Sequence, residues 1–111
     1  MSQKKRQRVL FVCTANALRS RTAEEIFKNR NNLEVKSAGT HNIADVKVTK
    51  ELIHWADRIF VMELHHKKHL LRLDPESKYK IIVLNIPDIY DFMDPQLIEI
   101  LQDKVPHFLE K

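Results

Sequence analysis

A cysteine and an arginine, six positions apart, follow the first apolar run of this 111-residue chain. The segment RVLFVCTANALRS, residues 8–20, leads from strand-like residues into Cys13 and ends on Arg19 and Ser20. A thiolate is a nucleophile, and a loop of backbone N–H groups followed by a helix start stabilises negative charge. The planar guanidinium of Arg19 matches two phosphate oxygens, and Ser20 can donate to the thiolate or cap the helix. The segment therefore predicts nucleophilic chemistry on an oxyanion.

The alternative is that Cys13 is a small buried hydrophobe at a strand end and that Arg19 is a surface cation. The order strand, loop, helix, together with the trailing Arg and Ser, favours the chemical interpretation. The loop contains no glycine. Asn16 is the loop residue best able to adopt a left-handed backbone conformation, so we expect it at the turn, with its side chain tying the loop in place.

Strand-like apolar runs recur at 8–13, 33–39, 57–63 and 80–85, and the stretches between them have helical character. This alternation predicts an α/β fold in which crossover helices connect the strands of a parallel sheet. The carboxyl ends of such strands meet at one edge of the sheet. We therefore expect four polar segments to converge there: Cys13 and its loop, Ser37 to Thr40, Glu63, and residues 85–91.

Four helices are expected, and the helical spacing of apolar residues supports three of them, since the segment of the third has few apolar positions. The first follows Cys13, the second is capped by Thr49 with Glu51 in its first turn, the third lies within 64–73, and the last starts at Asp94 and Pro95. Residues 73–78 read as a turn, and Pro106 should kink or end the last helix. The apolar positions are Ala23, Ile26 and Phe27 in the first helix, Val48, Leu52, Trp55 and Ala56 in the second, and Leu97, Leu101, Val105 and Phe108 in the last. Trp55 is expected to pack rather than bind.

Composition is that of an ordinary globular protein, with 43% hydrophobic and 31% charged residues. We expect one domain over 1–111, with 1–7 as a basic lead-in. The longest apolar run, Val9 to Cys13, is far shorter than the roughly 20 residues of a membrane span. The charged start and the lone cysteine, which cannot form an intramolecular disulfide, predict a cytoplasmic protein with no membrane partner.

A basic run and a pair of histidines raise two alternatives, nucleic-acid binding and metal binding. The net charge of +4 and the run KKRQR at 4–8 could attract nucleic acid, but a solvated lead-in explains the run better, so no nucleic-acid partner is expected. His65 and His69 are four apart and could hold a metal ion. Two intervening lysines and no carboxylate at ligand spacing favour a solvated basic face, so no metal is expected.

The segment VLFVCTANALRS, followed by TAEEIF, resembles the phosphate-binding signature of the low-molecular-weight protein tyrosine phosphatases. The resemblance continues through SAGT at 37–40, DRIFVME at 57–63 and IPDIYD at 86–91, and so touches all four strand ends. It implies a short bacterial-type member with a single-domain, Rossmann-like, four-stranded parallel sheet and a phosphate-binding loop after the first strand.

The resemblance also implies a two-step phosphoryl transfer that needs neither a metal nor another cofactor. Cys13 would attack phosphorus, Arg19 and the loop amides would hold the oxygens, and water would hydrolyse the cysteinyl-phosphate. Asn16 and Ser37 would bond each other to brace the loop, and Ser20 would stabilise the leaving thiolate. The loop residues expected to surround the substrate phosphate, or inorganic phosphate in its place, are Thr14, Ala15, Asn16, Ala17 and Leu18.

The general acid must come from Asp88, Asp91 or Asp94. Asp94 precedes Pro95 and is better explained as a helix cap, although the acid in the family is also usually followed by proline. Asp88 matches the position of the acid in the family, except that Ile89 replaces the proline; Asp91 is the substitute. Tyr90 would stack against an aromatic substrate, or else is an ordinary half-buried loop residue.

The chain departs from the family pattern at several positions. Leu18 stands where many relatives have a second cysteine, which removes a disulfide rescue of Cys13 and argues against an arsenate reductase. Ala15 replaces a glycine, Arg21 replaces a proline, and the segment 41–56 is shortened. A phosphorylated protein or small aryl phosphate is the expected substrate, phosphoarginine remains open because Ala17 is small, and a catalytically weak phosphate-binding or phosphoprotein-binding module is the alternative function.

Overall fold

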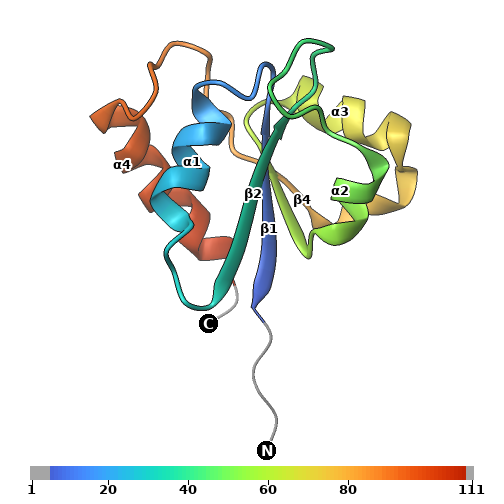
Figure 1. Cartoon of the computed structure of the whole chain (residues 1–111), viewed down its shortest axis with the longest axis horizontal. Helices are drawn as coiled ribbons and strands as arrows, with labels where there is room; N and C mark the ends of the chain where they lie inside the picture. The colour runs from blue at the N-terminus through green and yellow to red at the C-terminus, as the bar shows by residue number, and fades with distance from the viewer. Residues whose placement is uncertain (1–5, 110–111) are drawn as a thin grey trace, which may run out of the picture.

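Four parallel strands form one sheet in the order β2-β1-β3-β4 (Figure 1). In this computed structural model, which describes residues 6–109, the strands are β1 Gln7–Cys13, β2 Leu33–Gly39, β3 Arg58–Val61 and β4 Ile81–Val83. Residues 9–12 of β1 are completely buried, as expected for a central strand covered on both faces. The predicted fold class, a four-stranded parallel sheet with flanking helices, is confirmed.

Helices cover both faces of the sheet (Figure 1). The helices α1 Arg19–Phe27 and α4 Pro95–Lys104 pack on one face, and α2 Lys50–Trp55 and α3 Leu64–Leu73 pack on the other. Alternate residues of β1 supply the two cores: Val9 and Phe11 face the first pair of helices, and Leu10 and Val12 face the second. The Phe11 ring stacks between Phe27 and Phe60, with ring centroids 5.7 and 5.4 Å away.

The predicted helix ends are confirmed at two places. The hydroxyl of Thr49 accepts a hydrogen bond from the backbone N–H of Leu52, and the carboxylate of Asp94 accepts one from Gln96. The last α-helix ends at Lys104 and tightens into the 3-10 helix η2 Val105–Phe108, which contains Pro106. Proline lacks the backbone donor that a continuing α-helix would need, so the helix ends where the sequence predicts.

Three details differ from the sequence-based expectation. Residues expected to form a turn at 73–78 instead complete α3 and then form the 3-10 helix η1 Pro75–Lys80, because the Asp74 carboxylate caps it at Glu76. The most buried residue of α2 is Ile53, which the predicted apolar stripe omitted. Strands β3 and β4 are shorter than expected, since β4 is preceded directly by η1 and the other flanking residues lie in loops.

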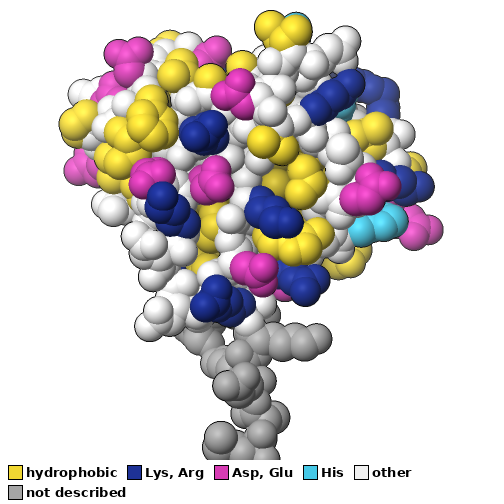
Figure 2. All heavy atoms as spheres, in the orientation of Figure 1, with side chains coloured by type: hydrophobic (Ala, Val, Ile, Leu, Met, Phe, Trp, Pro, Cys, Tyr) yellow, Lys and Arg dark blue, Asp and Glu magenta, His cyan; other side chains and the backbone are white. Residues whose placement is uncertain are grey.

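The surface gives little support to a nucleic-acid site on the face shown in Figure 2. Lys and Arg side chains are interspersed there with Asp and Glu side chains over the face that carries β2. The lysines of the basic run, Lys4 and Lys5, lie outside the described residues.

Trp55 is half-buried against the second core, with the ammonium of Lys36 4.5 Å from its ring centroid. Within residues 6–109, no helix is long and apolar enough to span a membrane.

The carboxyl ends of β1, β2 and β3 open on one edge, at the top of Figure 1. The register pairs Cys13 with Gly39, and Val61 of β3 with Val12, so these strands end nearly level. The loop after β1, the loop after β2, the start of α3 and the segment after β4 therefore gather around the end of β1, as predicted for the polar segments.

Candidate active site

In the loop formed by residues 14–18, between β1 and α1, carbonyl oxygens are hydrogen-bonded within residues 6–109 whereas the backbone N–H groups are not. The carbonyl oxygens of Cys13, Thr14 and Ala15 accept hydrogen bonds from the backbone of residues 40, 41 and 45. The backbone N–H groups of residues 14–18 have no acceptor within the described part of the chain. Asn16 adopts φ 56°, the left-handed conformation expected for it. A loop with its N–H groups free is a nest for an anion.

All residues of this loop except Asn16 line a small pocket of about 120 Å³ at the end of β1. The predicted nucleophile, the predicted cation and the predicted general acid all line it, and Cys13 is 3% exposed. The lining residues are Cys13, Thr14, Ala15, Ala17, Leu18, Arg19 and Asp88. The structure thus brings together most of the residues that the sequence singled out.

Arg19 is held rigidly at the base of the pocket. It is 2% exposed, and its Nη1 donates to Glu63 Oε1 at 2.6 Å and to the carbonyl oxygen of Ile86 at 2.8 Å. Its Nε lies 3.7 Å from Asp88 Oδ1. The hydrogen bond and the charge of Arg19 lower the pKa of Glu63, which keeps that carboxyl ionised. The sequence placed Glu63 at this edge without giving it a role; the structure makes it the partner of Arg19.

A chain of buried hydrogen bonds runs from the thiol of Cys13 into the protein. Asn16 Nδ2 donates to both Ser20 Oγ and Ser37 Oγ at 2.9 Å, and Ser37 Oγ donates to Glu24 Oε1. Since Ser20 Oγ accepts from Asn16, its own proton can point to Cys13 Sγ, 2.9 Å away. The bond between Asn16 and Ser37 implied by the family resemblance is present. Ser20 contacts the sulfur and does not cap α1, whose start has no side-chain cap.

The three candidate acids occupy different environments. Asp88 lines the pocket with its side chain 62% exposed, whereas Asp94 caps α4. Asp91 is exposed and is not among the lining residues. Tyr90 is half-buried against the first core cluster and is not among the lining residues, and its stacking against a substrate stays a prediction. The backbone N–H of Met93 donates to Thr22 Oγ1 and ties this segment to α1.

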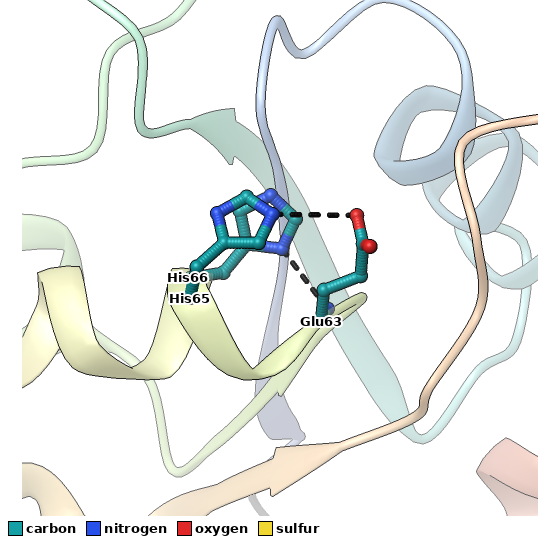
Figure 3. Close-up of side chains that lie close together, drawn as sticks. All are labelled: Glu63, His65 and His66. Atoms are coloured by element: carbon teal, nitrogen blue, oxygen red, sulfur yellow. Dashed lines mark hydrogen bonds and ion pairs between the residues drawn. The ribbon is translucent and has the colours of Figure 1, made fainter.

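The start of α3 contributes a second contact that the sequence did not indicate. His66 is completely buried, its Nδ1 accepts from the backbone N–H of Glu63 at 3.0 Å, and its Nε2 lies 2.9 Å from Thr14 Oγ1. His65 Nε2 lies 3.4 Å from the Glu63 carboxylate (Figure 3). The start of α3 therefore contacts both ends of the segment 14–19, through His66 to Thr14 and through Glu63 to Arg19.

Glu63, His65 and His66 also form a group whose possible ligand atoms lie within 4.8 Å of one another, whereas the sequence pairs His65 with His69 and offers no carboxylate at ligand spacing. A cation there would compete with Arg19 for Glu63 and with Thr14 for the Nε2 of His66. The guanidinium of Arg19 already neutralises the one carboxylate of the group. These contacts favour a hydrogen-bond network over a metal centre.

Gly39, the only glycine, lets β2 approach the loop closely. A Cβ atom built on it would lie 2.5 Å from the carbonyl oxygen of Thr14 and 2.8 Å from the backbone nitrogen of Asn16. No side chain larger than hydrogen fits there without moving the loop. Ala15, which replaces a glycine of the family pattern, does not need the conformational freedom of glycine. Among the described residues positive φ values occur only at Asn16, Asn85 and Met93.

Arg21, which replaces a proline of the family pattern, is half-exposed and lies between Glu24 and Asp45.

Comparisons with known proteins agree with this geometry. Residues 8–54 match the family described as low molecular weight phosphotyrosine protein phosphatase. A protein-arginine-phosphatase of Geobacillus stearothermophilus is 31% identical over 103 residues, covering 69% of this chain and 68% of the relative.

Two solved structures share the fold. The tyrosine phosphatase Wzb of Escherichia coli K30, in complex with phosphate, has a TM-score of 0.76 at 22% identity, covering 92% of this chain and 95% of that one. Wzb of Vibrio vulnificus, in complex with benzylphosphonate, has a TM-score of 0.69 at 23% identity, covering 86% and 90% of the two chains.

Proposed function

Because this chain belongs to the low-molecular-weight phosphotyrosine protein phosphatase family, we propose that it hydrolyses phosphomonoesters, with protein phosphotyrosine as the leading substrate. One observation carries the proposal. Cys13, the buried Arg19 and four residues of a loop whose backbone N–H groups are unpaired line a single pocket. This arrangement suits an anion placed directly over a nucleophilic sulfur.

In the first step, the Cys13 thiolate attacks phosphorus. An S–P bond forms as the P–O bond to the leaving group breaks, and the leaving oxygen takes a proton from Asp88. Arg19 and the loop N–H groups bind the three equatorial oxygens, on which charge is spread in the transition state. Ser20 Oγ, 2.9 Å from the sulfur, is placed to donate a hydrogen bond to it.

In the second step, water attacks the phosphorus of the cysteinyl-phosphate. The Asp88 carboxylate takes a proton from this water, the S–P bond breaks, and inorganic phosphate leaves as the thiolate is restored. Asp88 lies at the mouth of the pocket with most of its side chain exposed, where it can reach either a leaving group or water. The network from Asn16 to Ser37 and Glu24 braces the loop in both steps.

Phosphoarginine is the second candidate substrate. The relative that is 31% identical is a protein-arginine-phosphatase, and Ala17 leaves the pocket wall small at a position that faces the substrate in the family. The same two steps would apply, with the guanidinium nitrogen of the substrate taking the proton from Asp88. Hydrolysis of phosphotyrosine and phosphoarginine peptides of one sequence, measured side by side as kcat/KM, decides between the two.

The mechanism is tested by steady-state hydrolysis of p-nitrophenyl phosphate and phenyl phosphate from pH 5 to pH 7.5 in the presence of EDTA. Cys13→Ser should abolish turnover while retaining phosphate binding. Asp88→Asn should lower kcat by about 10²–10⁴ for phenyl phosphate, whose leaving group needs the proton more, and by less for p-nitrophenyl phosphate. Asp91→Asn is the matched control and should change kcat by less than about threefold.

Two outcomes would reject parts of the proposal. Turnover that persists in Cys13→Ser would rule out the cysteinyl-phosphate. A wild type that binds phosphate or vanadate without turnover would indicate a binding module, and the search would turn to phosphorylated partners. The cytoplasmic location predicted from the sequence stays a prediction.

A further inference from the structure

The protonation state of His66 follows from its two hydrogen bonds. A backbone N–H can only donate, so His66 Nδ1, which accepts from Glu63 N, must carry a lone pair rather than a proton. The remaining ring proton of a neutral imidazole then sits on Nε2. Burial, with the nearby charges of His65 and Arg19, lowers the pKa of His66 to about 4, so the ring is neutral near pH 7.

This tautomer also settles the role of the Thr14 hydroxyl. Since Nε2 donates, Thr14 Oγ1 must accept across the 2.9 Å contact. The hydroxyl proton of Thr14 is thereby left for another acceptor, and within residues 6–109 no side chain or backbone group accepts it. Thr14 lines the pocket next to Cys13, beside the unpaired loop N–H groups.

We propose that His66 is a positioning residue that directs the Thr14 hydroxyl, as a hydrogen-bond donor, at an oxyanion bound over Cys13. The inference rests on the proposed function, since it needs an oxyanion in the pocket. It adds a side-chain donor from Thr14 to the charge of Arg19 and the backbone donors of the loop. It also gives the start of α3 a direct part in the geometry of the site.

His66 has a second role that must be separated from this one, because it also binds Glu63 N at the start of α3. Two amide substitutions separate the roles. The longer side chain in His66→Gln can place an N–H near the position of Nε2 but loses the acceptor at Nδ1. The shorter one in His66→Asn can accept from Glu63 N near the position of Nδ1 but cannot reach Thr14. A purely structural role predicts that His66→Asn retains more vanadate affinity than His66→Gln, and the positioning role predicts the reverse.

The experiment measures vanadate affinity by calorimetry and by inhibition of aryl phosphate hydrolysis, because vanadate resembles the transition state of phosphoryl transfer. Thr14→Val removes the hydroxyl at nearly constant shape and should weaken vanadate binding about tenfold, whereas Thr14→Ser should stay within about twofold of the wild type. His66→Asn should weaken it as Thr14→Val does, and His66→Gln should retain most of the affinity. The double variant Thr14→Val/His66→Asn should bind vanadate no more weakly than either single variant.

The inference is overturned if Thr14→Val binds vanadate as the wild type does, or if His66→Asn retains affinity while His66→Gln loses it. Circular dichroism and thermal melting report whether each His66 variant folds; if neither folds, the comparison of Thr14→Val with Thr14→Ser still decides. A wild type that neither binds vanadate nor hydrolyses aryl phosphate would overturn the proposed function as well. Wild-type binding that Thr14→Val leaves unchanged would overturn this inference alone.

Discussion

Gly39→Ala is a one-methyl change that tests whether the end of β2 sets the position of the loop formed by residues 14–18. The new Cβ would lie 2.5 Å from the carbonyl oxygen of Thr14, 2.8 Å from the nitrogen of Asn16 and 2.7 Å from the Cβ of Ala44. Two of the three contacts are to backbone atoms of the loop, which cannot rotate away as a flexible side chain can. The strand or the loop itself must move.

The size of this movement follows from the distances. Ordinary contact begins near 3.4 Å, so the loop carbonyl must retreat by about 0.9 Å. Overpacking of a well-packed site costs about 1–3 kcal/mol of stability. A displacement of about 1 Å in the groups that position a substrate costs about 10²-fold in rate. We therefore expect kcat/KM for an aryl phosphate to fall about 100-fold, with a loss of about 2 kcal/mol in the free energy of unfolding.

The assay pairs kinetics with urea denaturation, and Ala44→Gly supplies the control. The variant Ala44→Gly removes the contact with the side chain and leaves both backbone contacts, so adding it to Gly39→Ala should not restore activity. Full activity in Gly39→Ala, within about threefold of the wild type, would refute the reasoning. Rescue by Ala44→Gly would show that the side-chain contact, rather than the loop, carried the effect.

Three other perturbations have expected outcomes that urea denaturation can check. Asn16→Ala and Asn16→Gly both lose three side-chain hydrogen bonds, but Ala must also adopt φ 56° and should be less stable than Gly by about 1 kcal/mol; equal stabilities would argue against strain at this turn. Arg19 lowers the pKa of Glu63, so the ionised carboxyl stabilises the fold at pH values above the ordinary pKa of glutamate, and this stabilisation is lost as the pH falls through the lowered pKa. Glu63→Gln should therefore flatten the loss of stability between pH 5 and pH 3. A slope equal to that of the wild type would contradict this expectation. Burial lowers the pKa of His66 to about 4, so as the pH drops below about 6.5 this histidine binds a proton in the unfolded chain before it does so in the folded protein. The free energy of unfolding of the wild type should therefore decrease by about 2 kcal/mol between pH 7 and pH 5 through this residue. His66→Gln should not show this decrease.

Local signals predicted the features that depend on neighbouring residues. The strand-loop-helix order placed Cys13 and Arg19 on one loop, and the absence of glycine there indicated the left-handed Asn16. Asp94 as a cap followed from its proline neighbour. Two features could not be predicted from such local signals. Packing against the sheet decided that Ile53 is the buried residue of α2, and the cap at Asp74 decided that a 3-10 helix, η1, forms where a turn was expected.

Contacts between distant residues could not be predicted in the same way. Glu63 follows Arg19 by 44 positions and His66 follows Thr14 by 52, so their pairing depends on β3 lying next to β1 in the sheet. The same holds for Gly39, whose close approach to the loop depends on the register of β2. The one available signal was a polar residue at the carboxyl end of a buried strand. It placed Glu63 at the correct edge of the sheet but did not identify Arg19 as its partner.

The sequence by itself determined the chemistry: a thiol, a fixed cation and a loop of backbone donors lie within seven consecutive residues, and local periodicity positions them at a strand end. Only the tertiary structure decided how that loop is held. Its supports at Ser37, Gly39, Glu63 and His66 come from other strand ends and from α3. Strand order and register, which short-range patterns do not encode, bring these supports to the same edge of the sheet.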